Sequence, residues 1–393
     1  MEALPLLPKY KPYPRSKVEM RFCFSATCGP LTALTTFFLA TDAPVYTLDM
    51  QNRFYLWLYS CAKPVQLDWN HLPPDLPATD LRYFLGIFKH LDHLLTGAGM
   101  TFVLTWHLDA FHEVMQDAVI FLIGDEQYQM PSYLRHVRAL FKTGGLQPNP
   151  LRDTLGLPWP VAWRALLRDA RNLGTRMRRR WRYGPSGKVA TLQGELPLGY
   201  FQLCDAEPKP VNQRPVDVFF AGVQAASGWT LRASVAARKQ MAAGLAAAQA
   251  ALPQYRFESW LAAFASGRRL NPEEYTQALS NAKIALAPRG NFDETFRLFE
   301  AAKLGCVIVS DPLPRRWYYQ NCPLVSIHKW SALPDVLKDL LADPARLAEL
   351  SLRTRQWWDT VLSKDAVAKY IIEQLTNGKP AAMRKCISSS AGP

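Results

Sequence analysis

The chain has 393 residues, enough for two domains of ordinary size, and 49% of them are hydrophobic, which excludes global disorder. Its formal net charge of +13 favours an anionic partner: nucleic acid, an anionic membrane surface or a phosphate-bearing substrate. The seven cysteines are scattered and form no CxxC pair, so they predict neither a zinc site nor a disulfide framework, and a reducing cytosol is the simplest compartment.

The first forty residues contain an apolar run but no targeting signal that we can identify. Residues 1–17 lack the charged-then-apolar order of a signal peptide. Residues 22–41 carry no charge over nearly the length of a membrane span, ~20 residues, but the turn Cys28-Gly29-Pro30 interrupts them. We interpret this run as a strand, a tight loop and a helix rather than as a membrane span.

The rest of the N-terminal half predicts an irregular mixture of strands and helices. Apolar or alternating runs predict strands at 18–25, 43–48, 101–106 and 118–123, and helical spacing predicts a helix at 81–95. Residues 164–188 follow, with RMRRRWR at their centre. This basic segment is compatible with a solvated helix face and with a contact to a membrane surface or another polyanion.

The C-terminal half is regular and follows a polar, proline-rich segment at 204–215. Expected strands at 216–220, 255–260, 283–287, 306–310 and 324–327 alternate with expected helices at 231–251, 271–282, 293–304, 333–341, 344–362 and 366–375. Such alternation is typical of a parallel, doubly wound sheet. We predict an N-terminal α/β domain at 1–205, a linker at 206–215, a C-terminal domain at 216–363, a terminal helix at 364–378 and a flexible tail at 379–393.

Residues 287–311, APRGNFDETFRLFEAAKLGCVIVSD, contain a well-marked helix between two strands. Asn291 and Asp293 are good helix N-caps, and Glu294 lies three residues after Asn291, as in a capping box. Gly305 lies where a left-handed C-cap belongs. These signals predict a helix from about residue 293 to residue 304.

The charged residues of this stretch form a candidate ligand site. Glu294, Arg297 and Glu300 are spaced to share one helix face. The turn with Arg289 and Gly290 ends a predicted strand and leads into a helix N-terminus, a position that favours anions. The alternative is that the three residues form only solvated intrahelical salt bridges, worth ~0.5 kcal/mol or less each.

The same stretch resembles the donor-binding segment of the exostosin-like glycosyltransferases. The matching parts are the turn Pro288-Arg289-Gly290, the pair Phe296-Arg297, the triplet Phe299-Glu300-Ala301 and the run GCVIV at 305–309. The strand VDVFFAG at 216–222 and the later Arg238 are also similar in placement to features of that family. The resemblance covers roughly residues 216–330, and PRRW at 314–317 departs from the family pattern.

The resemblance implies two Rossmann-like domains facing across a cleft, the GT-B architecture, with the terminal helix crossing back to the N-terminal domain. Arg289 and Arg297 would contact the diphosphate or nucleotide, Glu300 would accept hydrogen bonds from the ribose hydroxyls, and Gly222 would let backbone amides approach the diphosphate. The expected donor-binding set is completed by Arg238, Gly290 and Glu294. No metal and no cofactor are expected, because arginines and helix dipoles would neutralise the leaving diphosphate.

An inverting transfer also needs a general base, which should come from the N-terminal domain at the end of a strand. Asp125 and Glu126 directly follow an apolar run, and His107 follows another expected strand. The alternative for Asp125 is a turn cap, and for Glu126 a solvated position.

The leading hypothesis is a glycosyltransferase that uses a nucleoside-diphosphate sugar, with a UDP-sugar favoured. The acceptor would be a glycan or a lipid-linked precursor in surface polysaccharide synthesis. The enzyme would be cytoplasmic, held at the inner face of the membrane by the arginine run at 176–182. No nucleic-acid partner is expected, since no nucleic-acid motif occurs. The alternative is a noncatalytic protein that binds a nucleotide sugar or a polyanion.

Overall fold

The computed structural model describes residues 51–58, 61–70, 81–124, 129–146, 191–201, 203–224, 233–263, 270–290 and 294–377, together with scattered residues between Trp159 and Met177. Several predictions lie outside the described residues: the strands at 18–25 and 43–48, the candidate bases Asp125 and Glu126, the caps Asn291 and Asp293, and all of the arginine run 176–182 except Met177.

A six-stranded sheet forms the first half of the described chain, in the order β2-β1-β3-β4-β5-β6. The strands are β1 (Arg53–Trp57), β2 (Val65–Gln66), β3 (Thr101–Thr105), β4 (Val119–Leu122), β5 (Ala139–Thr143) and β6 (Leu192–Leu196). Only the short β2 pairs antiparallel among them. The predicted strands at 101–106 and 118–123 are confirmed as β3 and β4, whereas β1, β5 and β6 were not predicted.

The second sheet is parallel throughout and has the order β11-β10-β9-β7-β8. Its strands are β7 (Val216–Gln224), β8 (Phe257–Ala263), β9 (Ala282–Ala287), β10 (Val307–Ser310) and β11 (Val325–Ser326). All five were predicted, so the α/β class with a parallel, doubly wound sheet is confirmed. Because β7 lies between β8 and β9, the winding direction reverses between β7 and β9, which makes this pair the topological switch point.

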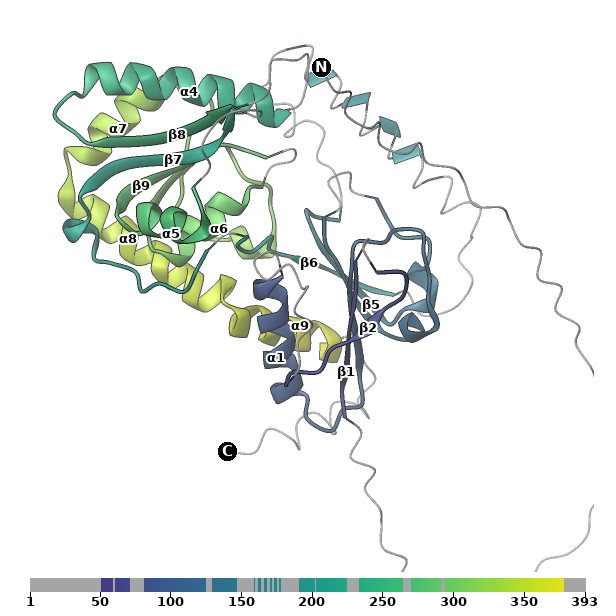
Figure 1. Cartoon of the computed structure of the whole chain (residues 1–393). Coiled ribbons are helices and arrows are strands. Elements are labelled where there is room, and N and C mark those ends of the chain that lie inside the picture. Colours follow the sequence, from purple (N-terminus) through teal and green to yellow (C-terminus); the bar gives the residue numbers. More distant parts are fainter. Residues whose placement is uncertain are drawn as a thin grey trace, which may run out of the picture. The chain divides into compact units, whose positions relative to one another are not determined.

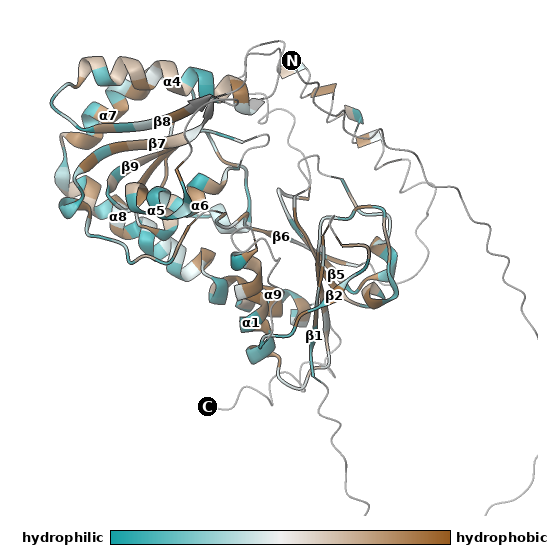
Figure 2. Cartoon of the chain, viewed as in Figure 1, coloured by the Kyte–Doolittle hydropathy of each residue, from teal (hydrophilic) through white to brown (hydrophobic). Residues whose placement is uncertain are grey.

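Helices cover both faces of the second sheet (Figure 1). One face carries α4 (Ala233–Ala251) and α7 (Leu333–Leu341), and the other carries α5 (Pro272–Ser280) and α6 (Phe296–Lys303). The strands between them are coloured as mainly hydrophobic in Figure 2, as a sheet buried on both faces requires. Asn271 and Glu274 form a capping box at the start of α5, where a cap was predicted. No helix in the described part of the chain is both long and apolar enough to cross a bilayer.

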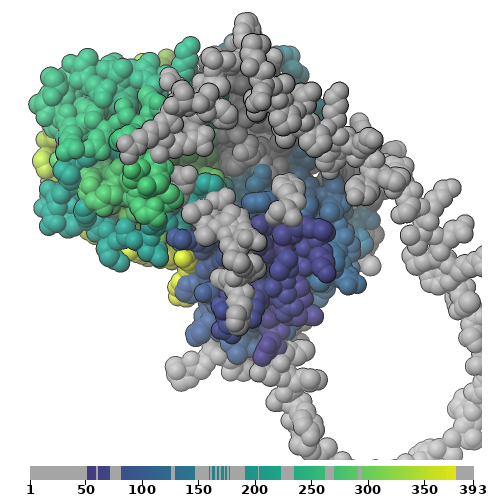
Figure 3. Space-filling model, viewed as in Figure 1, coloured from purple at the N-terminus to yellow at the C-terminus, as the bar shows by residue number. Residues whose placement is uncertain are grey.

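The last helix returns to the first sheet. After α8 (Pro344–Trp357), a π-helical turn at Trp358–Leu362 redirects the chain into α9 (Lys364–Asn377). This helix packs against α1 (Arg82–Leu94), so yellow C-terminal atoms lie against the purple-blue atoms of α1 in Figure 3. The hydroxyl of Tyr83 donates to the carbonyl oxygen of Leu362 at 2.7 Å and fixes the crossing point. The expected return of the terminal helix to the N-terminal half is thus present.

Arg214 fastens the predicted linker to the second sheet. Its side chain is 2% exposed. The guanidinium donates to the carbonyl oxygens of Ala282 at 2.8 Å and Leu304 at 2.6 Å, and also to that of Lys209. The segment before β7 is therefore held by the loops of the second sheet and does not behave as a free spacer.

Buried tyrosines make the free energy of unfolding sensitive to alkaline pH. Burial raises the pKa of Tyr83, Tyr275, Tyr318 and Tyr319 well above the ordinary value. Above pH ~10 the unfolded chain has lost protons that the folded chain keeps, so this stabilisation is lost as the pH rises. We expect the urea concentration at the unfolding midpoint, followed by tryptophan fluorescence, to fall above pH ~10. In Tyr83→Phe, unfolding at this pH should release about one proton fewer, so the midpoint should depend less on pH. A midpoint that stays constant would contradict the expectation.

Candidate functional site

Four predicted donor-binding residues lie at the carboxyl edge of β7 and β9, the switch point of the second sheet. Gly222 is near the end of β7, and Arg289 follows β9. Arg238 is in the N-terminal half of α4, and Arg297 is in the first turn of α6, the helices that follow those strands. In open α/β sheets this edge is the usual place for a ligand, because the loops diverge there and helix N-termini face it.

Arg297 is fixed against β7. Its Nε donates to the carbonyl oxygen of Ala221, and its guanidinium lies 4.9 Å from the centroid of the Phe220 ring. A Cβ added at Gly222 would come within 2.4 Å of Nη2 of Arg297. Within the described residues, no carboxylate forms an ion pair with Arg297. Gly222 therefore provides the space that the guanidinium occupies, a role that the sequence did not predict.

Arg238 brings a second positive charge near Arg297. Its side chain is half-buried, and its pKa is lowered to about 10, first by burial and then by the charge of Arg297. An anion bound here would offset both the cost of burial and the repulsion between the two guanidinium groups. The pair is therefore a candidate anion site.

Asp311, directly after β10, holds the turn that carries Arg289. Its carboxylate accepts from the backbone N–H of Arg289 at 2.7 Å and from Nε1 of Trp330 at 3.1 Å. Burial raises the pKa of Asp311, and the hydrogen bond and charge of Arg289 oppose that rise. Arg289 is itself buried and Gly290 is half-buried. The turn is thus a fixed part of the sheet edge, and Asp311 is a residue that the sequence analysis missed.

Glu300 lies inside the protein rather than on a solvated face. Its side chain is 3% exposed. One carboxylate oxygen accepts from the hydroxyl of Tyr275 at 2.6 Å, and the other accepts from the backbone N–H of Phe201 at 3.1 Å. The carboxylate therefore links α6 to α5 and to the segment after β6. Its predicted contact with a ribose stays a prediction.

The helix that carries these residues begins later than predicted. α6 starts at Phe296 with Thr295 at the N-cap, so Glu294 precedes the helix and does not share a face with Arg297 and Glu300. The C-terminus follows the prediction. Gly305 has φ 65° and its N–H donates to the carbonyl of Ala302, while the next N–H donates to that of Ala301, which is a Schellman motif.

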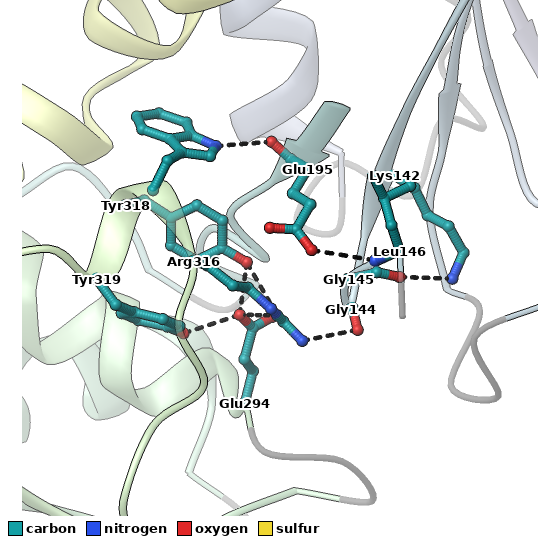
Figure 4. A network of polar contacts seen from close by, with 10 residues as sticks. Lys142, Gly144, Gly145, Leu146, Glu195, Glu294, Arg316, Tyr318 and Tyr319 are labelled. Atoms are coloured by element: carbon teal, nitrogen blue, oxygen red, sulfur yellow. Dashed lines mark hydrogen bonds and ion pairs between the residues drawn. The ribbon is translucent and has the colours of Figure 1, made fainter. Parts of the chain in front are cut away.

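Glu294 is the centre of a buried polar network (Figure 4). Its Oε1 accepts from Nη1 of Arg316, from the hydroxyl of Tyr318 at 2.6 Å and from that of Tyr319 at 2.9 Å. Burial raises the pKa of Glu294, and the charge of Arg316 opposes the rise. Burial lowers the pKa of Arg316, but Glu294 and the tyrosines outweigh it. The raised pKa of Glu294 disfavours an ion pair between the two side chains, whereas the raised pKa of Arg316 favours it. Because three donors converge on Oε1 of Glu294, we assign the pair as ionised.

The network also reaches the first sheet. Nη2 of Arg316 donates to the carbonyl oxygen of Gly144, just after β5, at 2.8 Å. A Cβ at Gly145, where φ is 89°, would lie 2.6 Å from that nitrogen. Nζ of the fully buried Lys142 donates to the Gly145 carbonyl at 3.0 Å and closes the turn (Figure 4). Glu294 is thus engaged in joining the two sheets, which explains why it does not cap the predicted helix or face Arg297.

Gly222→Ala tests whether the position of Arg297 matters for ligand binding. The added methyl group would displace the guanidinium, so we expect nucleotide affinity to fall about tenfold, measured by titration calorimetry. In an Arg297→Ala background, Gly222→Ala should have little further effect on nucleotide affinity, because the guanidinium that the methyl group would displace is absent. Gly86→Ala is the matched control, since its Cβ would meet only the flexible end of Lys364. Equal losses in both backgrounds would contradict this reading.

In the first sheet, His107 lies just beyond β3. Its ring is 4.4 Å from that of Trp57, its Nε2 is 3.4 Å from the carbonyl oxygen of Leu58, and its own carbonyl accepts from Tyr133 at 2.8 Å. His107 therefore lies at the carboxyl edge of β1 and β3, and its role as a base stays a prediction. No group of three or more His, Cys, Asp or Glu side chains is placed to hold a metal ion within the described part of the chain.

Residues 238–376, which run from within α4 into α9 and include both arginines of the anion site, match a family model described as "Glycosyl transferase-like". The C-terminal region is therefore similar to glycosyltransferase-like domains. The match is to this general family and does not extend to the exostosin-like assignment. No curated protein matches the chain in sequence.

The chain also aligns with solved structures. One is a GtfA/B complex, with 12% identity, TM-score 0.39, and coverage of 80% of this chain and 65% of the other. Another is the pneumococcal O-GlcNAc transferase GtfA in complex with UDP and GlcNAc, with 10% identity, TM-score 0.38, and coverage of 75% of this chain and 59% of the other. A third is a TarM variant from S. aureus, with 7% identity, TM-score 0.39, and coverage of 75% of this chain and 58% of the other. The chain spans less than two thirds of the length of each of these proteins.

Proposed function

We propose that the chain is a glycosyltransferase that moves a sugar from a nucleoside-diphosphate sugar, with a UDP-sugar favoured, to a glycan or glycolipid acceptor. The observation that carries the proposal is the Arg238–Arg297 pair at the switch point of the second sheet. Its two partly buried, mutually repelling positive charges suit a diphosphate. The pair also lies within the region that matches the glycosyl transferase-like family.

In the proposed reaction the sugar–diphosphate bond breaks as the acceptor oxygen forms its bond to the same sugar carbon. Negative charge then develops on the leaving diphosphate, where Arg238 and Arg297 would stabilise it. Arg289 would lie toward the nucleotide, and Glu300 would accept from the ribose hydroxyls. Since two guanidinium groups can take the place of a divalent cation, we propose a metal-independent reaction with no cofactor.

The proton of the acceptor hydroxyl would pass to a base on the first sheet. We propose His107, Asp125 or Glu126, and an inverting course, in which base and leaving diphosphate lie on opposite sides of the sugar carbon. The two sheets would close over the substrates in the GT-B manner. The exostosin-like resemblance of residues 287–311 supports a role in surface polysaccharide synthesis, carried out in the cytoplasm at the inner face of the membrane.

Thermal unfolding of the full chain with UDP, GDP, uridine and inorganic diphosphate tests donor binding. We expect one nucleoside diphosphate to raise the melting temperature and uridine to have no effect. A panel of nucleotide sugars, followed by release of the nucleoside diphosphate with and without EDTA, then tests transfer and the need for metal. If RNA or polyphosphate stabilises the chain while no nucleotide does, the alternative of a polyanion-binding protein replaces this proposal. Nucleotide binding without sugar release would indicate a noncatalytic nucleotide-sugar binder.

A further inference from the structure

Exposed apolar side chains are concentrated on one helical segment of the N-terminal half. Every described residue between Trp159 and Met177 is helical. Five large hydrophobic side chains here are at least half exposed: Trp159 72%, Trp163 50%, Leu167 51%, Leu173 54% and Met177 64%. Only four others are notably exposed in the rest of the described chain. Since scattered exposure is ordinary but clustering is not, this segment calls for an explanation.

The spacing places these five residues in one stripe. At 3.6 residues per turn, all five side chains lie within an arc of roughly 120° around the helix axis, with Leu173 at one edge of the arc and Leu167 at the other. The rings of Trp159 and Trp163 stack, with centroids 6.0 Å apart and an angle of 27° between their planes. Ala162, beside the stripe, is 7% exposed. The apolar stripe is therefore exposed, with a buried residue directly beside it.

The same segment is strongly basic. Between residues 159 and 182 the sequence carries a single acidic residue, Asp169, and eight arginines: Arg164, Arg168, Arg171, Arg176, Arg178, Arg179, Arg180 and Arg182. Arg171, which the structure describes, is exposed. A helical segment that exposes a stripe of tryptophan, leucine and methionine and is rich in arginine in its sequence is suited to the boundary between lipid headgroups and acyl chains.

We infer that the stripe of Trp159, Trp163, Leu167, Leu173 and Met177 inserts into the surface of an anionic bilayer. Charge complementarity selects this occupant over two others. A second copy of the chain would bring two arginine-rich segments together. The other candidate occupant, residues 1–48 of the same chain, carries five basic and three acidic residues and is therefore also positive. Either occupant would place positive charge against positive charge. Nucleic acid would attract the arginines but would leave the apolar stripe in water.

The inference extends the proposed function, since a lipid-linked acceptor would be reached at the same surface, but it does not depend on donor binding. It also changes the sequence-based expectation, which assigned membrane contact to the arginine run alone. Arginines without the stripe would give binding that salt abolishes, whereas an inserted stripe should retain part of its binding at high salt.

The test is flotation of the full chain with phosphatidylcholine vesicles, with and without phosphatidylglycerol. We expect binding only to the anionic vesicles, with partial retention at high salt. Trp159→Ser combined with Trp163→Ser should weaken that binding on the order of tenfold or more. Trp260→Ser combined with Leu352→Ser is the matched control, because those side chains are exposed elsewhere, 37% and 59%, and should leave binding unchanged.

Quenching of tryptophan fluorescence by brominated lipids adds a readout that does not rely on the variants. We expect quenching in the wild-type chain and its loss in the double tryptophan variant. Failure to bind anionic vesicles at low salt, or equal binding of both double variants, would overturn the inference. So would a dimer in sedimentation analysis that the tryptophan variant dissolves, or RNA binding that competes with the vesicles and depends on the stripe. Nucleotide-induced stabilisation of the same variants tests the proposed function separately.

Discussion

Replacing Arg297 with alanine should lower the affinity for the nucleoside diphosphate about 100-fold, a loss on the order of 2–3 kcal/mol. The guanidinium is already aligned by Ala221 and Phe220, so a bound diphosphate would gain its charge without ordering a flexible side chain. Arg297→Lys should recover only part of the affinity, because an ammonium group cannot offer two parallel donors. Titration calorimetry with the wild-type chain and both variants measures the effect.

Two controls accompany this prediction. Arg256→Ala removes an arginine that is 61% exposed and paired with Glu258 on β8, and should leave nucleotide affinity unchanged. The pKa of Arg238 should move upward in Arg297→Ala, since one cause of its lowering is removed. Nucleotide affinity that is the same in Arg297→Ala and the wild type would remove the basis of the proposed function.

Replacing Arg316 with methionine should lower the free energy of unfolding by about 3–5 kcal/mol at neutral pH. The change leaves Glu294 buried with the two tyrosine hydroxyls as its donors, and it removes the hydrogen bond to Gly144 that joins the network to the first sheet. Removing only one member of a buried pair costs more than the pair contributes, because the remaining charge is no longer compensated. Urea unfolding followed by tryptophan fluorescence measures the loss.

The pH dependence separates a lost charge pair from a general packing defect. Without Arg316 the pKa of Glu294 should rise further, because burial then acts with less opposition. A group whose pKa is raised in the folded state contributes stability that is present below its unfolded-state pKa, ~4.5 for Glu294. This stability is lost as the pH rises through the folded-state pKa. Arg316→Met should therefore regain stability toward acid pH, and adding Glu294→Gln should flatten that response. Arg353→Met, on an exposed pair with Glu349, should change little.

The second sheet could be predicted from sequence because its strands are apolar runs bounded by clear helix signals. Asn271 and Gly305 mark helix ends by local rules that tertiary structure rarely overrides, and both predictions are confirmed. In the first sheet, β1, β5 and β6 were missed. Their sequences RFYLW, ALFKT and LQGEL are short and contain charged or polar residues that only the tertiary partners explain. Lys142, for example, is buried in β5 because its ammonium closes a glycine turn.

The candidate site was predicted in part. Arg297, Arg238 and Gly222 lie at one sheet edge, as the order of strands and helices required. Glu294 was assigned to the same helix face, but capping rules consider only nearby residues, and its actual partner Arg316 is 22 residues away. The run PRRW was noticed as a departure from a family pattern, yet nothing in the sequence alone shows that one of its arginines is buried between two sheets.

The return of α9 has a consequence for synthesis of the protein. Ala368, Ile371 and Leu375 belong to the same apolar core as Phe88 on α1 and Phe121 on β4. Those N-terminal residues leave the ribosome more than two hundred residues before their last packing partners do. The first sheet therefore cannot finish its core while the second is being translated, and we expect the nascent N-terminal half to depend on chaperones until α9 emerges.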